Sequence, residues 1–447
     1  MRARHLPRVL HSFDISVLAS ASMGPAYSLA STMGPMVAAA GFAAPGALVV
    51  LSAIMLCVAI SFSYLSRVEP NAGSSYSWIR MAFGDRTGAY GAWLLLLSNF
   101  FATMAIAVPA GIYTLALVAP AHAQDPLWAA IVGAVWILAS SLLLYVGMRP
   151  TALVTFLALG FELVVLVATA IAAVLHPHVA AVAPAASSAK TPSPGIGLAG
   201  FVTAMTLAVW MSDGWEVSAS TSEEVDDTAI ASGRGGIVGL IVSTVVLVLC
   251  MFAYLRLGTL QGFVDNQADT LAYVGELLGG GWWRTIIVVT VLLSTLSTLW
   301  TTILYLSRSV FAMGRDGVLP RVLGELDHRD EPFWSLAVVA VLVTVSELIT
   351  GFSKTAADQL EIVLNASSVF LGLLFVLSAA AAVRRFWGER SSRLGGVVVP
   401  LVGAIALLGV LAATIVVEDR VLQAYAWGGV LLGIPFAFWR GRKLRLS

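Results

Sequence analysis

The chain has 447 residues, of which 59% are hydrophobic and 11% charged, and its mean hydropathy is +0.90. Soluble domains carry about 25% charged residues, so this composition excludes a soluble fold and indicates an integral membrane protein. Lysines plus arginines equal aspartates plus glutamates at 25 each, so no basic surface for a nucleic acid is expected.

A helix needs about 20 mostly apolar residues to cross a bilayer, and the sequence contains twelve such runs. They predict an all-α integral membrane protein with twelve transmembrane helices. The spans are expected at residues 12–40, 44–66, 88–118, 127–147, 151–175, 196–221, 236–257, 283–312, 334–351, 360–383, 396–417 and 421–439.

Positive charge is distributed unevenly between the two sides of this topology. With a cytoplasmic N-terminus, 20 of the 25 lysines and arginines lie inside, and the other five are Lys190, Arg256, Arg284, Lys354 and Arg420. The positive-inside rule therefore predicts that both termini are cytoplasmic. The expected location is the inner (cytoplasmic) membrane of the cell, with the lipid bilayer as a partner.

Two spans are interrupted at mid-depth by residues that break helices. The first span carries Ser22-Met23-Gly24-Pro25, and the sixth carries Ser212-Asp213-Gly214. Irregular backbone at this depth is tolerated where it lines a cavity inside the protein. Broken helices in corresponding positions of two halves indicate the binding site of a transporter.

The sixth span enters from outside and the first from inside, as expected for inverted repeats. The expected organisation has six parts: a cytoplasmic N-terminal tail (1–11), a first inverted repeat with helices 1–5 (12–175), an external loop (176–195), a second inverted repeat with helices 6–10 (196–383), helices 11–12 (384–439), and a basic cytoplasmic tail (440–447).

Three stretches resemble the amino acid–polyamine–organocation (APC) superfamily of permeases. They are SRSVFAMGRDGVLP (307–320) followed by Glu331-Pro332, GWEVSASTSEEVDD (214–227), and EPNAGSSYSWIRMAFGDRTGAYGAW (69–93). The resemblance implies a leucine-transporter-like fold, a 5+5 inverted repeat with two additional C-terminal helices. It also implies an amino acid permease that works by alternating access.

The sequence departs from the family pattern in two places. The break of helix 1 reads LASASMGPAYSLAST, without the G-x-G pattern that many members carry. Helix 5 reads FLALGFELVVL where many members have a lysine, so Glu162 carries the opposite charge.

Opening a helix frees amides at one half-helix and carbonyls at the other. The amide end can bind a carboxylate and the carbonyl end can bind an ammonium group, so the two half-helices together can bind both charged groups of an amino acid. The expected substrate-binding residues are Ser20, Ala21, Ser22, Met23, Gly24, Pro25, Ala26, Asn99, Trp210, Ser212, Asp213, Gly214 and Thr295. A simple proline kink, a packing tryptophan and hydrogen bonds between helices are the structural alternatives.

Three acids within the spans are candidate site residues. Asp213 is expected either to bond freed backbone amides, to compensate a positive group on the substrate, or to bind a coupling proton. Glu162 is expected either to carry protons or to hydrogen-bond a serine or threonine of a neighbouring helix. Glu216 and Trp210 occupy positions where the resemblance implies a proton or release switch and an aromatic gate. Glu162, Trp210 and Glu216 are therefore the expected coupling and gating residues. The acids at the end of this segment, Glu223, Glu224, Asp226 and Asp227, are expected to form a solvated cytoplasmic face.

The sequence thus predicts a secondary active transporter of amino acids, by symport or exchange. A polyamine or organic amine permease of the same fold is the alternative. The expected coupling ion is H⁺, with Na⁺ as the other possibility, and no cofactor, metal or catalytic residue is expected. All six histidines lie in tails, loops or span ends, which argues against a membrane-embedded enzyme. The sequence carries no information on the oligomeric state.

Overall fold

The computed structural model is described here for residues 6–176, 197–226, 231–267, 269–352, 356–417 and 420–443. Within these ranges the protein is helical and contains no β-sheet. The α-helices are α1 (Ser12–Ser22), α2 (Pro25–Ala40), α3 (Ala44–Val68), α4 (Ser74–Phe83), α5 (Asp85–Val118), α6 (Pro126–Val146), α7 (Met148–Leu175), α8 (Leu198–Met211), α9 (Val217–Ser220), α10 (Ala231–Tyr254), α11 (Leu260–Asp265), α12 (Thr270–Gly279), α13 (Gly281–Arg315), α14 (Phe333–Thr350), α15 (Ala356–Phe386), α16 (Val399–Val417) and α17 (Arg420–Lys443). Single turns η1 (Gly41–Ala43), η2 (Pro120–His122), η3 (Ser222–Glu224), η4 (Arg321–Gly324) and η5 (Arg390–Ser392) are 3₁₀, and η6 (Leu394–Val398) is a π-helical turn.

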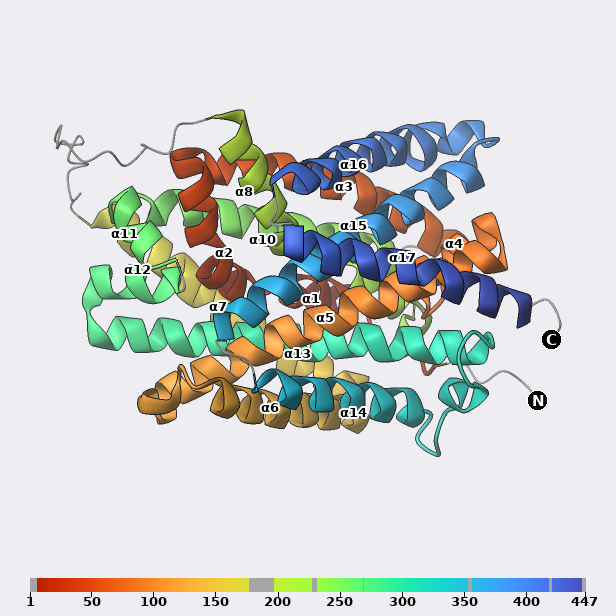
Figure 1. Ribbon diagram of the computed structural model, residues 1–447, viewed down its shortest axis with the longest axis horizontal. Coiled ribbons are helices and arrows are strands. Elements are labelled where there is room, and N and C mark those ends of the chain that lie inside the picture. Colours follow the sequence, from red (N-terminus) through yellow and green to blue (C-terminus); the bar gives the residue numbers. More distant parts are fainter. Residues whose placement is uncertain are drawn as a thin grey trace.

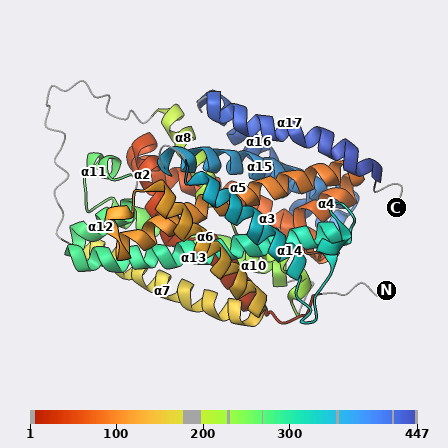
Figure 2. The ribbon, with the colours of Figure 1, turned by 60° about the horizontal axis from the view of Figure 1, so that its bottom comes forward.

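Most long helices run lengthwise through the molecule and form one bundle (Figure 1). The first described residues and the end of α17 lie at one end of the bundle, which we call the terminal end. The short helices α11 and α12 lie at the opposite end, which we call the distal end. The turned view shows α7 and α17 on opposite sides of the bundle (Figure 2).

Helix α13 is the central helix of this bundle. Of the most apolar 18-residue stretch of α13, 78% is buried, against 33% of the corresponding stretches of α7 and α14. It packs against helices from both halves of the chain, including α1, α2, α5, α7 and α14. Residues on α13 can therefore reach both helix breaks.

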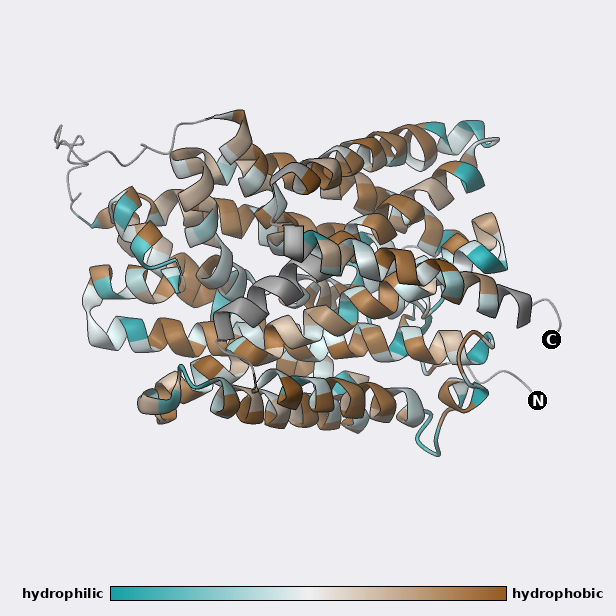
Figure 3. Cartoon of the chain, viewed as in Figure 1, coloured by the Kyte–Doolittle hydropathy of each residue, from teal (hydrophilic) through white to brown (hydrophobic). Residues whose placement is uncertain are grey.

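The outer helices expose apolar side chains. Leu153, Leu157 and Val164 of α7 are 59%, 60% and 68% exposed, and hydrophobic residues predominate in the helices between the two ends (Figure 3). Among the described residues, nine helical stretches are long and apolar enough to cross a membrane, and one of them, Ser12–Val68, takes in α1, α2 and α3 together. The protein is a multi-pass membrane protein, whereas the twelve crossings and the repeat symmetry stay predictions.

The predicted spans agree with the helices to within a few residues at most ends. The predicted spans contain none of α4, α11 and α12, which are too short to cross a bilayer. Of the predicted loop at residues 176–195, only His176 lies within the described residues.

Candidate functional site

The first predicted helix break is confirmed. Helix α1 ends at Ser22 and α2 begins at Pro25, with Gly24 between them in the left-handed conformation (φ +52°). A Cβ on Gly24 would also collide with the hydroxyl of Thr298 on α13. Pro25 fits the first position of α2 because no amide hydrogen is needed there. Only glycine allows this left-handed break between α1 and α2 so close to α13.

The second predicted break is confirmed as well. Helix α8 ends at Met211, and the chain resumes helical structure only at Val217. Gly214 has φ +103°, and a Cβ there would lie 2.5 Å from the carbonyl oxygen of Ser22. The two interrupted helices therefore approach each other closely at their breaks, backbone to backbone.

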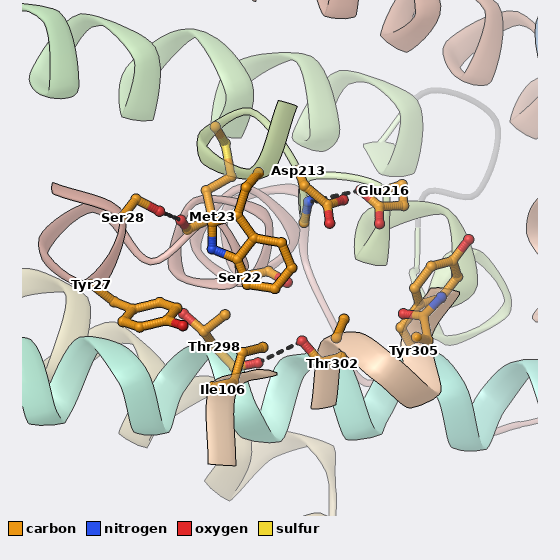
Figure 4. Close-up of a pocket in the computed structure, with 14 residues that line it drawn as sticks. Ser22, Met23, Tyr27, Ser28, Ile106, Asp213, Glu216, Thr298, Thr302 and Tyr305 are labelled. Atoms are coloured by element: carbon orange, nitrogen blue, oxygen red, sulfur yellow. Dashed lines mark hydrogen bonds between the residues drawn. The ribbon is translucent and has the colours of Figure 1, made fainter. Parts of the chain in front are cut away.

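A small cavity lies at this junction (Figure 4). It measures about 30 Å³, which is room for about two water molecules and less than any amino acid needs. Tyr27 and Tyr305 lie at its two ends in Figure 4. Its lining residues come from α1, α2, α5, α8, α13 and the two breaks: Ser22, Met23, Tyr27, Ser28, Asn99, Ala102, Ile106, Trp210, Asp213, Gly214, Glu216, Thr298, Thr302 and Tyr305.

The structure brings seven of the predicted site residues to the cavity wall: Ser22, Met23, Asn99, Trp210, Asp213, Gly214 and Glu216. It places the others beside or behind that wall: Ser20, Ala21, Gly24, Pro25, Ala26, Glu162, Ser212 and Thr295. The hydroxyl of Ser212 bonds Ser52 on α3, and that of Thr295 donates to the Val291 carbonyl on its own helix.

On α13 the cavity is lined by Thr298, Thr302 and Tyr305 instead of Thr295. Thr295 lies on the same face of α13 but about 4.5 Å further toward the distal end. The sequence predicted the polar face of α13 correctly but not which residues along that face line the cavity.

Two carboxyl groups of the cavity share one amide. The amide of Gly214 donates to Oδ1 of Asp213 at 2.6 Å and to Oε2 of Glu216 at 3.0 Å. Like charges this close make ionisation of both groups unfavourable unless a proton or a cation joins them. The lining residues include no lysine or arginine. The cavity wall is therefore suited to an ammonium group.

Glu162 of α7 lies at the start of α2 and is fully buried. Its Oε1 accepts hydrogen bonds from the Ala26 amide at 2.6 Å and from the Ser294 hydroxyl at 2.7 Å. The predicted hydrogen bond to a serine of a neighbouring helix is thus present. Its role as a proton carrier stays a prediction.

Tyr27 is fixed by a helix irregularity on α5. Pro109 has no amide hydrogen, so the Ala105 carbonyl one turn earlier loses its helical donor. The hydroxyl of Tyr27 donates to this carbonyl at 2.9 Å. Tyr27 is not among the residues predicted from the sequence, because the proline that frees its partner carbonyl lies on another helix.

The prediction that Glu223 and Glu224 form a solvated face is wrong. Both are buried, and Glu223 accepts two hydrogen bonds from Arg315 at 2.7 and 2.9 Å. Arg308 of α13 donates to Glu224 at 2.8 and 3.2 Å and to Glu331 at 3.1 Å. These ion pairs join η3, α13 and the start of α14 at the terminal end.

Glu331 lies in the loop before α14, outside the membrane-spanning segments. Burial raises its pKa from 4.5 to about 7; Arg308 opposes the rise, and the nearby Glu224 adds to it. One guanidinium thus faces two buried carboxylates, so one of the two is ionised at a cost in free energy.

Comparisons with known proteins agree with this arrangement. The amino acid permease family matches residues 10–431. A branched-chain amino acid permease of Lactococcus lactis subsp. cremoris is 24% identical over 466 residues, covering 98% of this chain and 96% of that protein. An uncharacterised transporter of Mycobacterium tuberculosis is 28% identical over 451 residues, covering 98% and 92%. An uncharacterised transporter of Legionella pneumophila is 22% identical over 379 residues, covering 80% and 79%.

The family match covers most of the chain and both broken helices, and the similar proteins are named as permeases or transporters. Both findings point to a transporter and not to an enzyme. The chain belongs to the amino acid permease family, within the APC superfamily that its motifs resemble.

Proposed function

We propose that this protein is a secondary transporter that moves amino acids across the cytoplasmic membrane by alternating access. The observation that carries the proposal is the pair of broken helices, α1/α2 and α8/α9, which meet at one buried cavity. The proposal includes twelve crossings, a 5+5 repeat followed by two helices, and both termini in the cytoplasm. Cysteines at Glu276 of α12 and Glu389 after α15 should then label from opposite sides of the membrane.

The size of the cavity supports alternating access. A space of about 30 Å³ holds no amino acid, so the described conformation does not accommodate the substrate. Substrate entry therefore requires that one end of the cavity opens. Tyr27 toward the distal end and Tyr305 toward the terminal end are the side chains that such openings would move.

The lining chemistry favours a substrate with an ammonium group and an apolar side chain. Asp213 and Glu216 supply negative charge for the α-amino group. Met23, Ala102, Ile106 and Trp210 supply apolar surface for a side chain. A neutral amino acid with an aliphatic side chain fits both, and the relative from Lactococcus lactis is named for branched-chain amino acids.

We propose H⁺ as the coupling ion. Two buried carboxyl groups, Glu162 and Glu216, and the partly exposed Asp213 lie at or beside the cavity and can accept protons.

An organic amine without a carboxylate is the second candidate substrate. The observation that favours it is the contact of Glu162 with the Ala26 amide, which occupies the electropositive start of α2. A substrate carboxylate would have to compete for that amide, whereas an amine would not.

Uptake into proteoliposomes tests the proposal. Purified protein is assayed with labelled leucine, valine, alanine and lysine and with the amines derived from them, with and without an inward proton gradient. Accumulation of at least one amino acid that depends on the gradient is expected. Amine accumulation without any amino acid uptake would support the second candidate. No uptake of any compound above protein-free liposomes would refute both.

The substitution Asp213→Asn tests the role of Asp213 in substrate binding. If Asp213 compensates a positive group beyond the α-amino group, affinity for lysine should fall by tenfold or more while leucine is little affected. Equal losses for both are expected if Asp213 faces the α-amino group that both ligands share, or if it holds the break open through its bond to Gly214.

A further inference from the structure

Glu162 has one satisfied and one unsatisfied oxygen. Its Oε1 accepts from the Ala26 amide at 2.6 Å and from the Ser294 hydroxyl at 2.7 Å. Its Oε2 is buried and has no hydrogen-bond partner among the described residues. A fully buried carboxyl group with a free oxygen is a place where a proton can be held, because burial disfavours its charged form.

The start of α2 has no free donor in this conformation. Pro25 lacks an amide hydrogen, Ala26 donates to Glu162, and Tyr27 donates to the Ser294 hydroxyl at 3.1 Å. The next amide, that of Ser28, donates to the Gly24 carbonyl at 2.7 Å. The electropositive end of α2 is therefore already occupied by a carboxylate of the protein itself.

We infer that Glu162 occupies the position of a substrate carboxylate and is displaced from it by protonation. This inference rests on the proposed function, since it assumes an amino acid substrate. A proton from solution binds Glu162, the bond from Ala26 to Oε1 breaks, and the Ala26 amide then donates to the substrate carboxylate. One carboxylate replaces another at the amide, so the charge beside the Ala26 amide is unchanged, and the zwitterionic substrate together with its proton adds one positive charge to the site.

Electrostatics make the two events depend on each other. A second carboxylate beside an ionised Glu162 would place like charges together in a buried site, which is strongly unfavourable. A protonated Glu162 removes that repulsion. Conversely, an ionised Glu162 displaced from Ala26 would be a buried charge that has lost one of its two donors, which also disfavours binding without proton uptake.

The groups around Glu162 do not provide another explanation for such coupling. The hydrogen-bond partners of Glu162 among the described residues, the Ala26 amide and the Ser294 hydroxyl, are both uncharged. The described titratable residues on the helices that pack against α7 are Asp14, Tyr27, Tyr145, Arg234, Cys250, Tyr254, Tyr273, Glu276, Arg284, Tyr305, Arg308 and Arg315, and α7 itself carries Arg149. Asp213 and Glu216 belong to the cavity wall, where the proposed function places the amino group of the substrate.

The test compares an amino acid with its own amine. Binding of leucine and of 3-methylbutylamine to the purified full-length protein is measured by calorimetry between pH 5.5 and 8. Titration of Asp213 and Glu216 affects both ligands, so the ratio of the two dissociation constants isolates the carboxylate. The ratio should change in favour of leucine by up to tenfold for each unit of pH lowered. Leucine binding should take up close to one proton more than amine binding, as measured from heats in buffers of different ionisation enthalpy.

Variants identify the residue. Glu162→Gln should make the ratio independent of pH and abolish the extra proton uptake, because glutamine cannot take up the proton. Glu347→Gln is the matched control, since Glu347 is also a fully buried carboxyl within the bundle but lies on α14 against Gly133 of α6. It should keep the wild-type dependence. If Glu162→Gln does not fold, the inference is tested by the difference in proton uptake between leucine and amine binding to the wild-type protein.

A pH-independent ratio in the wild-type protein, or a pH-dependent ratio that survives in Glu162→Gln, would overturn the inference and leave amino acid transport intact. Amine binding with no amino acid binding at any pH would overturn both. If leucine does not bind but another amino acid of the uptake panel does, that amino acid and its own amine replace the pair.

Discussion

Replacement of Arg308 by glutamine tests whether the ion pairs at the terminal end keep that side of the cavity closed. Arg308 is 1% exposed and donates to three carboxylate oxygens at 2.8–3.2 Å. Glutamine keeps polar atoms but leaves the carboxylates of Glu224 and Glu331 without a cation. Breaking a buried ion pair by removing one partner costs about 3–5 kcal/mol.

That cost applies to the closed conformation, because opening exposes both carboxylates to water. A loss of about 3 kcal/mol changes an equilibrium by roughly a hundredfold, since about 1.4 kcal/mol corresponds to a factor of ten. The population open at the terminal end should therefore rise by a hundredfold or more, until the open form predominates.

Thiol labelling measures this population. Ser218 of α9 is 3% exposed and is replaced by cysteine in a protein whose Cys57 and Cys250 are changed to alanine. With Arg308→Gln the labelling rate by a charged maleimide should rise by the factor given above. Arg385→Gln is the control, because its pair with Glu389 is 37% and 41% exposed and such pairs contribute less than about 1 kcal/mol. Labelling of Arg308→Gln within threefold of the parent would refute the assignment.

Three further outcomes are expected. Tyr27→Phe leaves the buried Ala105 carbonyl without a donor, at a cost of about 1–3 kcal/mol, so the Tm should fall; an unchanged Tm would mean that the hydrogen bond does not form. Gly214→Ala adds a Cβ 2.5 Å from a backbone oxygen at φ +103°, so substrate binding should be lost while a folded protein is retained at lower Tm. Glu331 has a folded pKa of about 7 against 4.5 unfolded, so its contribution to stability is complete below pH 4.5 and is lost as the pH rises toward 7, by up to about 1.4 kcal/mol per unit. Glu331→Gln should therefore reduce the fall in Tm between pH 5 and 8, and the exposed Glu325→Gln should not; equal pH profiles would contradict the assignment.

The helix breaks could be predicted from the sequence because their causes are local. Gly24 and Gly214 adopt backbone conformations that few other residues tolerate, and Pro25 begins a helix where no amide is needed. Such residues inside apolar runs of spanning length are visible without any knowledge of the neighbours. The approximate helix bounds could be predicted for the same reason.

The partners of the buried charges could not be predicted, because they come from distant parts of the chain. Glu162 bonds Ala26 and Ser294, which are 136 and 132 positions away. Glu224 is buried because Arg308 reaches it from α13, 84 positions away. An acidic run at the end of a span has the same appearance whether it meets water or an arginine, so the sequence suggested a solvated face.

The same limit explains the missed cavity residues. Tyr27 directly follows residues that the sequence did identify, but its hydroxyl has a role only because Pro109 frees a carbonyl on α5. Thr298 and Thr302 share a helix face with Thr295, and only the packing of α1 and α2 against α13 determines which of these residues meet the cavity.

A structure determined with a bound amino acid at acidic pH tests the central claim most directly, namely that the two helix breaks form the substrate site. The ligand should lie between Ser22–Met23 and Asp213–Gly214, with its amino group at Asp213 and its carboxylate at the Ala26 amide that Glu162 has left. A ligand bound elsewhere, with both breaks still closed on each other, would contradict the account.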